Sequence, residues 1–255
     1  MTTQAHHAGV AKLWLLNLVS NAAALAAWYF WLLVPDARGW QVAGSVLVAV
    51  SIIVLVLWLR AGTLAYCRLA AFRESGAVWR AFRHSLRHLV ALALWGIVFA
   101  ALLWFLIWLR RYPPQFGVWL WQKLPSFLRV ASPGQLTHGA DRLLWILIWV
   151  VVPAAWLPIA ASVAAFGFGR RLVHSLRVLK RPMYWLWFCV LMLIGAYVPY
   201  KLFWWIPAVD DLRKQAWSMG LRFFAAYVIV ITAWIALVWL AGVRTEREEA
   251  TDFDG

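Results

Sequence analysis

The stretch VAGSVLVAVSIIVLVLWL, from Val42 to Leu59, contains no charged side chain and is almost entirely aliphatic. A helix rises about 1.5 Å per residue, so about 20 mostly apolar residues cross the roughly 30 Å hydrocarbon core of a bilayer. With eighteen residues, the stretch lies within the range for one crossing. We therefore interpret it as a membrane-spanning helix.

The composition of the whole chain supports the same interpretation. Its 255 residues are 65% hydrophobic and 13% charged and include 21 Trp, whereas soluble domains are about 45–50% apolar. Barrel strands are about ten residues long with alternating hydrophobicity, which these runs do not show. We expect an all-α polytopic integral membrane protein with six transmembrane helices. The predicted spans are residues 13–34, 42–59, 89–109, 143–167, 183–200 and 223–242.

The first span, the fifth span and the two ends of the chain need separate interpretation. The first span continues through WYFWLLV to Val34, so we expect a span rather than a cleaved signal peptide. The fifth could stop near Lys201, with LFWWI lying along the membrane surface, or could continue through it. Residues 1–12 form an N-terminal tail. Residues 243–255 form an acidic C-terminal tail, which we expect to be solvated and disordered.

The distribution of Lys and Arg predicts the orientation. With both termini in the cytoplasm, fourteen lie on the cytoplasmic side and ten on the other, which favours this threading under the positive-inside rule. We expect the bacterial cytoplasmic (inner) membrane. The longest connection, residues 110–142, is then external, and its VWLWQKLPSFL segment predicts a helix or turn in the interface.

The two long cytoplasmic connections are predicted to be basic amphipathic helices. Wound at about 100° per residue, each places cations on one side and apolar residues on the other. The apolar sides comprise Phe82, Leu86 and Leu89, and Leu172, Leu176 and Leu179. The cationic sides comprise Arg80, His84 and Arg87, and Arg170, His174, Arg177 and Arg181. We expect these seven residues to contact anionic lipid headgroups; the alternative is positive-inside charge without lipid selectivity.

No motif for chemistry accompanies this surface. The predicted spans contain no Asp or Glu, and the chain has no HExxH, no Gly-rich phosphate loop and no GxSxG. His84 and His88 have a metal-compatible spacing, but their neighbours are Arg. Cys67 and Cys189 match neither a disulfide framework nor a metal site. We expect no enzyme, no cofactor, no metal site and no nucleic-acid partner.

A few polar and helix-breaking residues lie within or beside the predicted spans. Asn17 and Asn21 lie one turn apart, and we expect their amides to bond a neighbouring helix. Arg60 follows the second span, and we interpret it as a cation at the cytoplasmic boundary. Pro153 and Pro158 predict a kinked fourth span, which could serve as a transporter hinge or only as a shape.

The tetrapeptide HSLR occurs twice, at residues 84–87 and 174–177, each time before a long apolar run. Each copy also follows an AAF segment and precedes a Trp at the same offset, Trp95 and Trp185. These matches favour a parallel hairpin repeat, in which spans two and three correspond to spans four and five. The alternative is convergent positive-inside patterning.

Three functions remain open. The first is a non-enzymatic membrane protein that contacts anionic lipids or a membrane partner protein through its basic face. The second is a transporter or flippase of an anionic amphiphile. The third is an enzyme acting on lipid phosphates, which would depend on His84 and His174 but lacks a nucleophile. We favour the first, because it uses every feature of the sequence.

Overall fold

The chain is all-helical in the part that the structure describes. A computed structural model describes residues 2–34, 38–123, 125, 132–169, 171–205 and 211–253, and no strand occurs among them. Within these residues, six helical stretches are long and apolar enough to cross a membrane, as expected for a multi-pass membrane protein. These candidate spans are His7–Leu32, Gly39–Arg68, Leu89–Leu109, Pro133–Phe166, Pro182–Trp204 and Leu212–Gly242.

The chain forms two compact units. Unit 1 comprises residues 1–92 and 158–255, and unit 2 comprises residues 93–157. Helices α5 (Leu89–Leu109) and α8 (Val152–Phe166) each pass from one unit into the other. The other described elements of unit 1 are α1 (Thr2–Leu32), α2 (Gly39–Arg68), α3 (Ala70–Glu74), α4 (Val78–Leu86), α9 (Arg171–Ser175), η3 (Leu176–Lys180), α10 (Pro182–Met192), η4 (Leu193–Tyr197), α11 (Val198–Trp204) and α12 (Leu212–Phe253).

Unit 2 is a helical hairpin, in which α6 (Pro113–Lys123) packs on α7 (Pro133–Ile146). Ser132 caps α7 by accepting a hydrogen bond from the backbone of Gln135, while the Gln135 side chain accepts one from the backbone of Ser132. An exposed ion pair joins Arg110 to Asp141, with Nε 2.7 Å from Oδ1. At this exposure the pair contributes little to stability.

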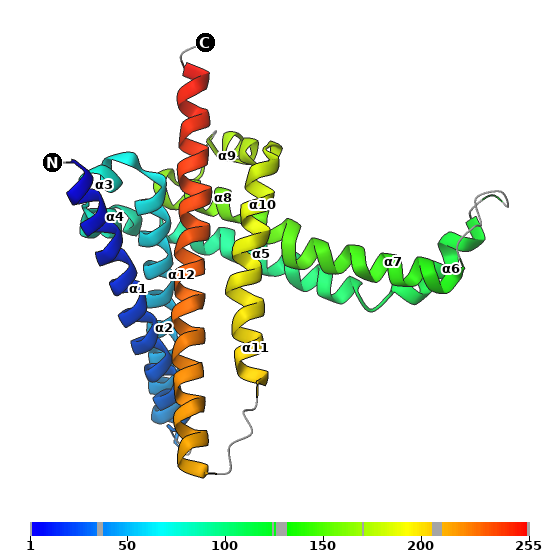
Figure 1. Ribbon diagram of the computed structural model, residues 1–255, viewed down its shortest axis with the longest axis horizontal. Coiled ribbons are helices and arrows are strands. Elements are labelled where there is room, and N and C mark those ends of the chain that lie inside the picture. The colour runs from blue at the N-terminus through cyan, green and yellow to red at the C-terminus, as the bar shows by residue number, and fades with distance from the viewer. Residues whose placement is uncertain are drawn as a thin grey trace. The chain divides into compact units, whose positions relative to one another are not determined.

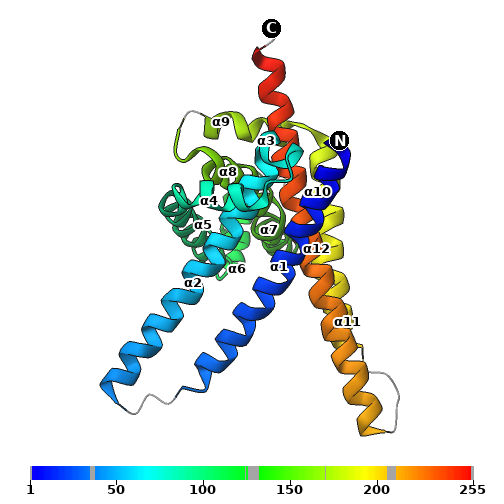
Figure 2. The same ribbon diagram turned by 90° about the vertical axis from the view of Figure 1, so that its left-hand side faces the viewer.

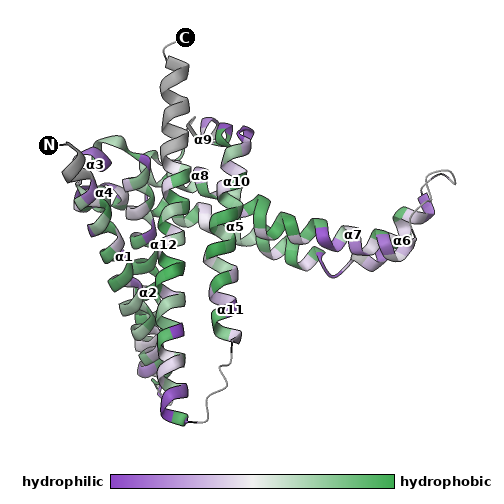
Figure 3. Ribbon diagram, viewed as in Figure 1, coloured by the Kyte–Doolittle hydropathy of each residue, from purple (hydrophilic) through white to green (hydrophobic). Residues whose placement is uncertain are grey.

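In unit 1, helices α1, α2 and α12 lie closest together at the end that carries the chain termini (Figures 1 and 2). Every residue from Ala61 to Arg68 is buried there. Farther along α2 the apolar side chains face outward, and Leu47 is 69% exposed. Figure 3 shows that apolar residues make up most of the coloured ribbon of α1, α2 and α12. An exposed apolar surface is unfavourable in water and is expected for helices surrounded by lipid.

Helix α4 packs on α2 through a close approach at Gly62. A Cβ atom on Gly62 would lie 2.5 Å from the ring of Phe82. Phe82 is buried, also contacts the ring of Trp58, and accepts a hydrogen bond from that indole at its carbonyl. The side of α4 that contains Phe82 therefore faces the protein, while Leu86 is 51% exposed. A role of this connection at the membrane surface stays a prediction.

Two candidate spans contain a π-helical turn two residues before a proline. The turn η2 (Leu147–Val151) precedes Pro153, and η4 precedes Pro199. Proline lacks an N–H and clashes with the carbonyl four residues earlier, and a local π turn relieves that clash within a continuing helix. Pro158 lies inside α8. The sequence thus predicted irregularity near Pro153, and a π turn is present there.

Several helix ends differ from the sequence-based prediction. The second span continues to Arg68, and the fifth continues as helix through Trp204. The fourth begins at Pro133 and includes Asp141, so one carboxylate does lie within a candidate span. The prediction of a disordered C-terminal tail is wrong, because α12 continues to Phe253. Its TEREEA segment is rich in strong helix formers, which allows the helix to continue.

Replacing Gly62 with Val tests the packing of α4 on α2. We expect Gly62→Val to lower the free energy of unfolding by about 1–3 kcal/mol, because Phe82 must leave its position. Thermal unfolding in detergent measures the change. The control is Gly44→Val in the same helix, where no atom lies within 4 Å of the added Cβ. Equal losses for the two variants would contradict the close approach.

Candidate functional site

A buried polar pair joins α1 to α2. Asn17 and Thr63 are both fully buried. Asn17 Nδ2 donates to Thr63 Oγ1 at 3.0 Å and to the carbonyl of Leu13. The Thr63 hydroxyl is 2.8 Å from the carbonyl of Leu59, to which it donates. The expectation that Asn17 bonds a neighbouring helix is therefore confirmed.

One turn farther along α1, Asn21 bonds Arg60 of α2. Arg60 Nη2 donates to Asn21 Oδ1 at 2.9 Å. Asn21 Nδ2 donates to the carbonyl of Asn17, which orients the amide oxygen toward Arg60. On its other side, Arg60 Cζ lies 4.8 Å from the ring centroid of Trp234 in α12. Asn17, Asn21, Arg60, Thr63 and Trp234 form what we call the polar cluster.

The helix that contains Arg60 does not end where the sequence predicted the span to end. The sequence placed Arg60 at the cytoplasmic boundary, just past a span ending at Leu59. In the structure α2 continues for eight residues beyond Arg60, which is about 12 Å along the helix axis. Arg60 therefore faces other helices of unit 1 from inside a candidate span. The sequence predicted the end of the span before AGTLAYC, because this segment is less apolar than the preceding run. In the structure the segment is helical and buried in protein.

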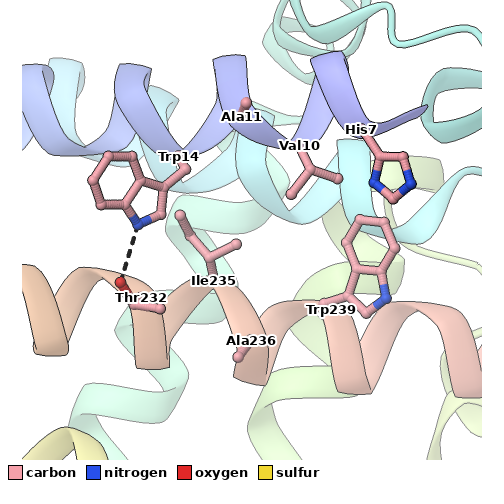
Figure 4. Close-up of a pocket in the computed structure, with 8 residues that line it drawn as sticks. All are labelled: His7, Val10, Ala11, Trp14, Thr232, Ile235, Ala236 and Trp239. Carbon is pink, nitrogen blue, oxygen red and sulfur yellow. Dashed lines mark hydrogen bonds between the residues drawn. The ribbon is translucent and has the colours of Figure 1, made fainter. Parts of the chain in front are cut away.

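Further contacts attach α12 to α1. Trp14 Nε1 donates to Thr232 Oγ1 at 3.0 Å, and the Tyr227 hydroxyl donates to the carbonyl of Leu18. Beside the first contact, a groove of about 720 Å³ runs between the two helices. Figure 4 shows the Trp14–Thr232 hydrogen bond at one end and His7 and Trp239 at the other. The floor between these ends is apolar, with Val10, Ala11, Ile235 and Ala236.

Two more arginines of unit 1 lie over aromatic rings. Arg68 Cζ is 5.5 Å from the ring centroid of Phe166, and Arg73 Cζ is 5.8 Å from that of Trp239. Both side chains are buried, and Arg73 also donates to the carbonyl of Cys67. Cation–π contacts strengthen when desolvated. Ring contacts thus accompany these two buried cations and the partly exposed Arg60.

Exposed cations lie on α4 and on η3. Figures 1 and 3 show hydrophilic residues in α3, α4 and α9 at the end of unit 1 that carries the termini. Helix α4 presents its cations because Val78, Ala81, Phe82 and Ser85 are buried on its other side. Beside them, Trp79 is 54% exposed and lies under Arg83. We call this surface the basic end: Arg80, Arg83, Arg87, Arg177, Lys180 and Arg181.

The predicted lipid-contact residues divide into three groups. Arg80, Arg87, His174, Arg177 and Arg181 are exposed at this end of unit 1. His84 is only half-buried but turns inward, and its Nε2 lies 2.8 Å from the carbonyl of Ala165, to which it donates. Arg170 lies outside the described residues. Lipid contact by these residues stays a prediction.

His88 packs beside a glycine with a left-handed backbone. Gly167 has φ +72°, and a Cβ there would lie 2.9 Å from His88 Nδ1. The rings of His84 and His88 are 5.4 Å apart. Burial lowers the pKa of His88 below its ordinary value of 6.5, and the nearby His84 and Arg87 lower it further.

The two HSLR copies share one local contact. Ser85 and Ser175 are both buried, and each donates to the carbonyl three residues earlier, of Phe82 and Leu172. The copies differ in helix type, since the first lies at the end of α4 and the second passes from α9 into the 3-10 helix η3. The parallel repeat stays a prediction.

Among the described residues, no group of three or more His, Cys, Asp or Glu could hold a metal ion. Cys67 is buried and Cys189 exposed, and both are free thiols.

Replacing Thr63 with Val tests the Asn17–Thr63 pair. The variant keeps the shape of the side chain but removes the hydroxyl, leaving Asn17 without its partner on α2. We expect the free energy of unfolding to fall by about 0.6 kcal/mol and by no more than about 1.7 kcal/mol. Thermal unfolding measures it, with Ser51→Ala as the control, because the Ser51 hydroxyl bonds only its own helix. A smaller effect for Thr63→Val than for the control would refute the pair's role.

His88 predicts a pH dependence of stability. Because its pKa is lower in the folded chain than in the unfolded chain, the unfolded chain binds more protons near that pH. The free energy of unfolding should therefore fall as the pH drops below about 6.5, and His88→Gln should flatten the profile. Unfolding measured from pH 8 to pH 5 tests this, with His138→Gln at an exposed position as the control. An unchanged profile in His88→Gln would contradict the assignment.

Comparison of the chain with protein-family models, curated proteins and solved structures found no match.

Proposed function

We propose that the chain is a non-enzymatic, multi-pass protein of the bacterial cytoplasmic membrane that binds anionic lipids through the basic end. The supporting observation is the geometry of α4. Val78, Ala81 and Phe82 are buried on the side of α4 that packs on α2, so Arg80 and Arg83 project from a packed helix and Arg87 from its C-cap. Cations near a membrane surface attract anionic headgroups, by about 1 kcal/mol each.

The aromatic residues beside these cations support the same proposal. Trp79 is 54% exposed, and its ring lies 5.9 Å from the guanidinium carbon of Arg83. Tryptophan is enriched at membrane–water interfaces, where its ring is buried and its N–H stays in contact with polar groups. With both termini in the cytoplasm, the basic end faces the leaflet that carries anionic lipid. A partner protein with an acidic surface is the other occupant that this end would accept.

A second candidate function is transport of an anionic amphiphile. The observation that favours it is Arg60, a cation inside a candidate span with a neutral amide as its hydrogen-bond partner. Ionisable residues within membrane spans commonly mark substrate pathways. Transport would also require a second state of unit 1, and a flippase assay with fluorescent phospholipid in vesicles tests for it.

Removing four cations tests lipid binding by the basic end. The variant carries Arg80→Gln, Arg87→Gln, Arg177→Gln and Arg181→Gln. At about 1 kcal/mol per cation, we expect its affinity for phosphatidylglycerol to fall roughly 100- to 1000-fold. Native mass spectrometry of protein from nanodiscs of phosphatidylcholine and phosphatidylglycerol measures the bound lipid.

A charge-matched variant serves as the control. It replaces four exposed cations elsewhere with Gln: Arg111, Lys123, Arg213 and Lys214. Because the net charge falls equally, a specific basic end predicts that this variant retains its bound phosphatidylglycerol. Equal lipid loss in the two variants, or none in either, would refute the proposal. A protein that co-purifies in stoichiometric amount and is lost only from the first variant would favour a partner protein instead.

A further inference from the structure

Arg60 carries a charge that no carboxylate balances within unit 1's candidate spans, which contain no Asp or Glu. Its hydrogen-bond partner is the neutral amide of Asn21, the ring of Trp234 lies over it, and the phenol of Tyr227 lies near it. Asn21 and Trp234 can orient a cation without cancelling its charge. Nη1 of Arg60 is buried and has no hydrogen-bond partner among the described residues.

The burial of Nη1 makes this arrangement costly. Arg60 lies about 12 Å along α2 from the end of the helix. A guanidinium group has five N–H donors and cannot lose its proton in a protein. A buried donor without an acceptor keeps its full desolvation penalty. The polar cluster therefore has an unused hydrogen-bond donor and an unbalanced positive charge at one place. An anion would supply both the acceptor and the negative charge.

We propose that Arg60 binds the oxyanion of a membrane-dissolved amphiphile, such as the phosphodiester of a phospholipid. Phosphate and carboxylate groups accept two parallel hydrogen bonds from a guanidinium edge. Asn21 holds Nη2, Trp234 covers the face, and the edge bearing Nη1 receives the ligand. The bond from Asn21 Nδ2 to the Asn17 carbonyl fixes the amide, so the site is ordered before the ligand arrives.

The surroundings of the cluster favour a lipid over an anion dissolved in water. Along the same helices, Leu25 is 61% exposed and Leu55 is 43% exposed, so exposed aliphatic side chains lie near the cluster in the sequence of both helices. An acyl chain is compatible with these surfaces, and a hydrated phosphate ion is not. Arg60 itself keeps partial exposure.

The test measures how phosphatidylglycerol changes the unfolding temperature. All proteins carry the four Gln substitutions at the basic end, so that surface binding does not obscure the result. At about 100 times the dissociation constant, a ligand that binds only the folded state should raise the unfolding temperature by about 5–10 °C. We expect this rise with Arg60 present, its loss in Arg60→Gln, and partial retention in Arg60→Lys, which keeps the charge.

Asn21→Asp gives an independent readout. The new carboxylate would lie against Nη2 and neutralise Arg60 internally, so the rise caused by phosphatidylglycerol should disappear although Arg60 is unchanged. The rise should survive in Ser51→Ala, which alters an exposed hydroxyl of the same helix. If Arg60→Gln lowers the unfolding temperature equally with and without phosphatidylglycerol, Arg60 is structural and the proposal fails.

Inorganic phosphate distinguishes the two sources of an oxyanion. We expect it to produce no shift at the concentration where phosphatidylglycerol does. A full, Arg60-dependent shift with inorganic phosphate would overturn the choice of a lipid ligand. The outcome is independent of lipid binding at the basic end, because Arg60 is tested in a background that lacks those four cations.

Discussion

A polar group inside a bilayer must find its partner within the protein, and this constraint determines how unit 1 is assembled. Asn17 and Asn21 on α1 meet Thr63 and Arg60 on α2. Trp14 then binds Thr232 on α12. These contacts join three candidate spans that are otherwise apolar and have little hydrophobic preference for one another over lipid. The close approach at Gly62 adds α4, and α4 in turn presents the basic end.

The helical architecture followed from the sequence because it depends on length and apolarity alone. Six apolar runs predicted six helices, and their number and order are confirmed. The amides at Asn17 and Asn21 could also be predicted to bond another helix, since one turn separates them on an apolar helix. Their partners could not. The pairing of α1 with α2 through Thr63 and Arg60 depends on helix rotation, which the nearly uniform apolarity of α2 does not encode.

The surroundings of Arg60 could not be predicted from hydropathy. The apolar run ends at Leu59, but the helix continues to Arg68, and the residues from Ala61 to Arg68 are buried in the protein. Asp141 was placed in a loop for the same reason. The sequence therefore indicated Asn17, Asn21 and Arg60 individually, but it did not indicate that they form one cluster. The contact between Arg60 and Trp234 joins residues far apart in the chain, which no local sequence pattern indicates.

The measurement that tests the assembly of unit 1 most directly is cross-linking of α1 to α2 in native membranes. In a chain with Cys67→Ala and Cys189→Ala, Asn17→Cys and Thr63→Cys place two thiols where the native side chains are in hydrogen-bond contact. Oxidation should join them within one chain, detected by mass spectrometry after proteolysis. The comparison pair is Leu15→Cys with Val54→Cys, at exposed positions of the same helices. The account predicts efficient cross-linking of the first pair only. Cross-linking of the second pair in place of the first would contradict it.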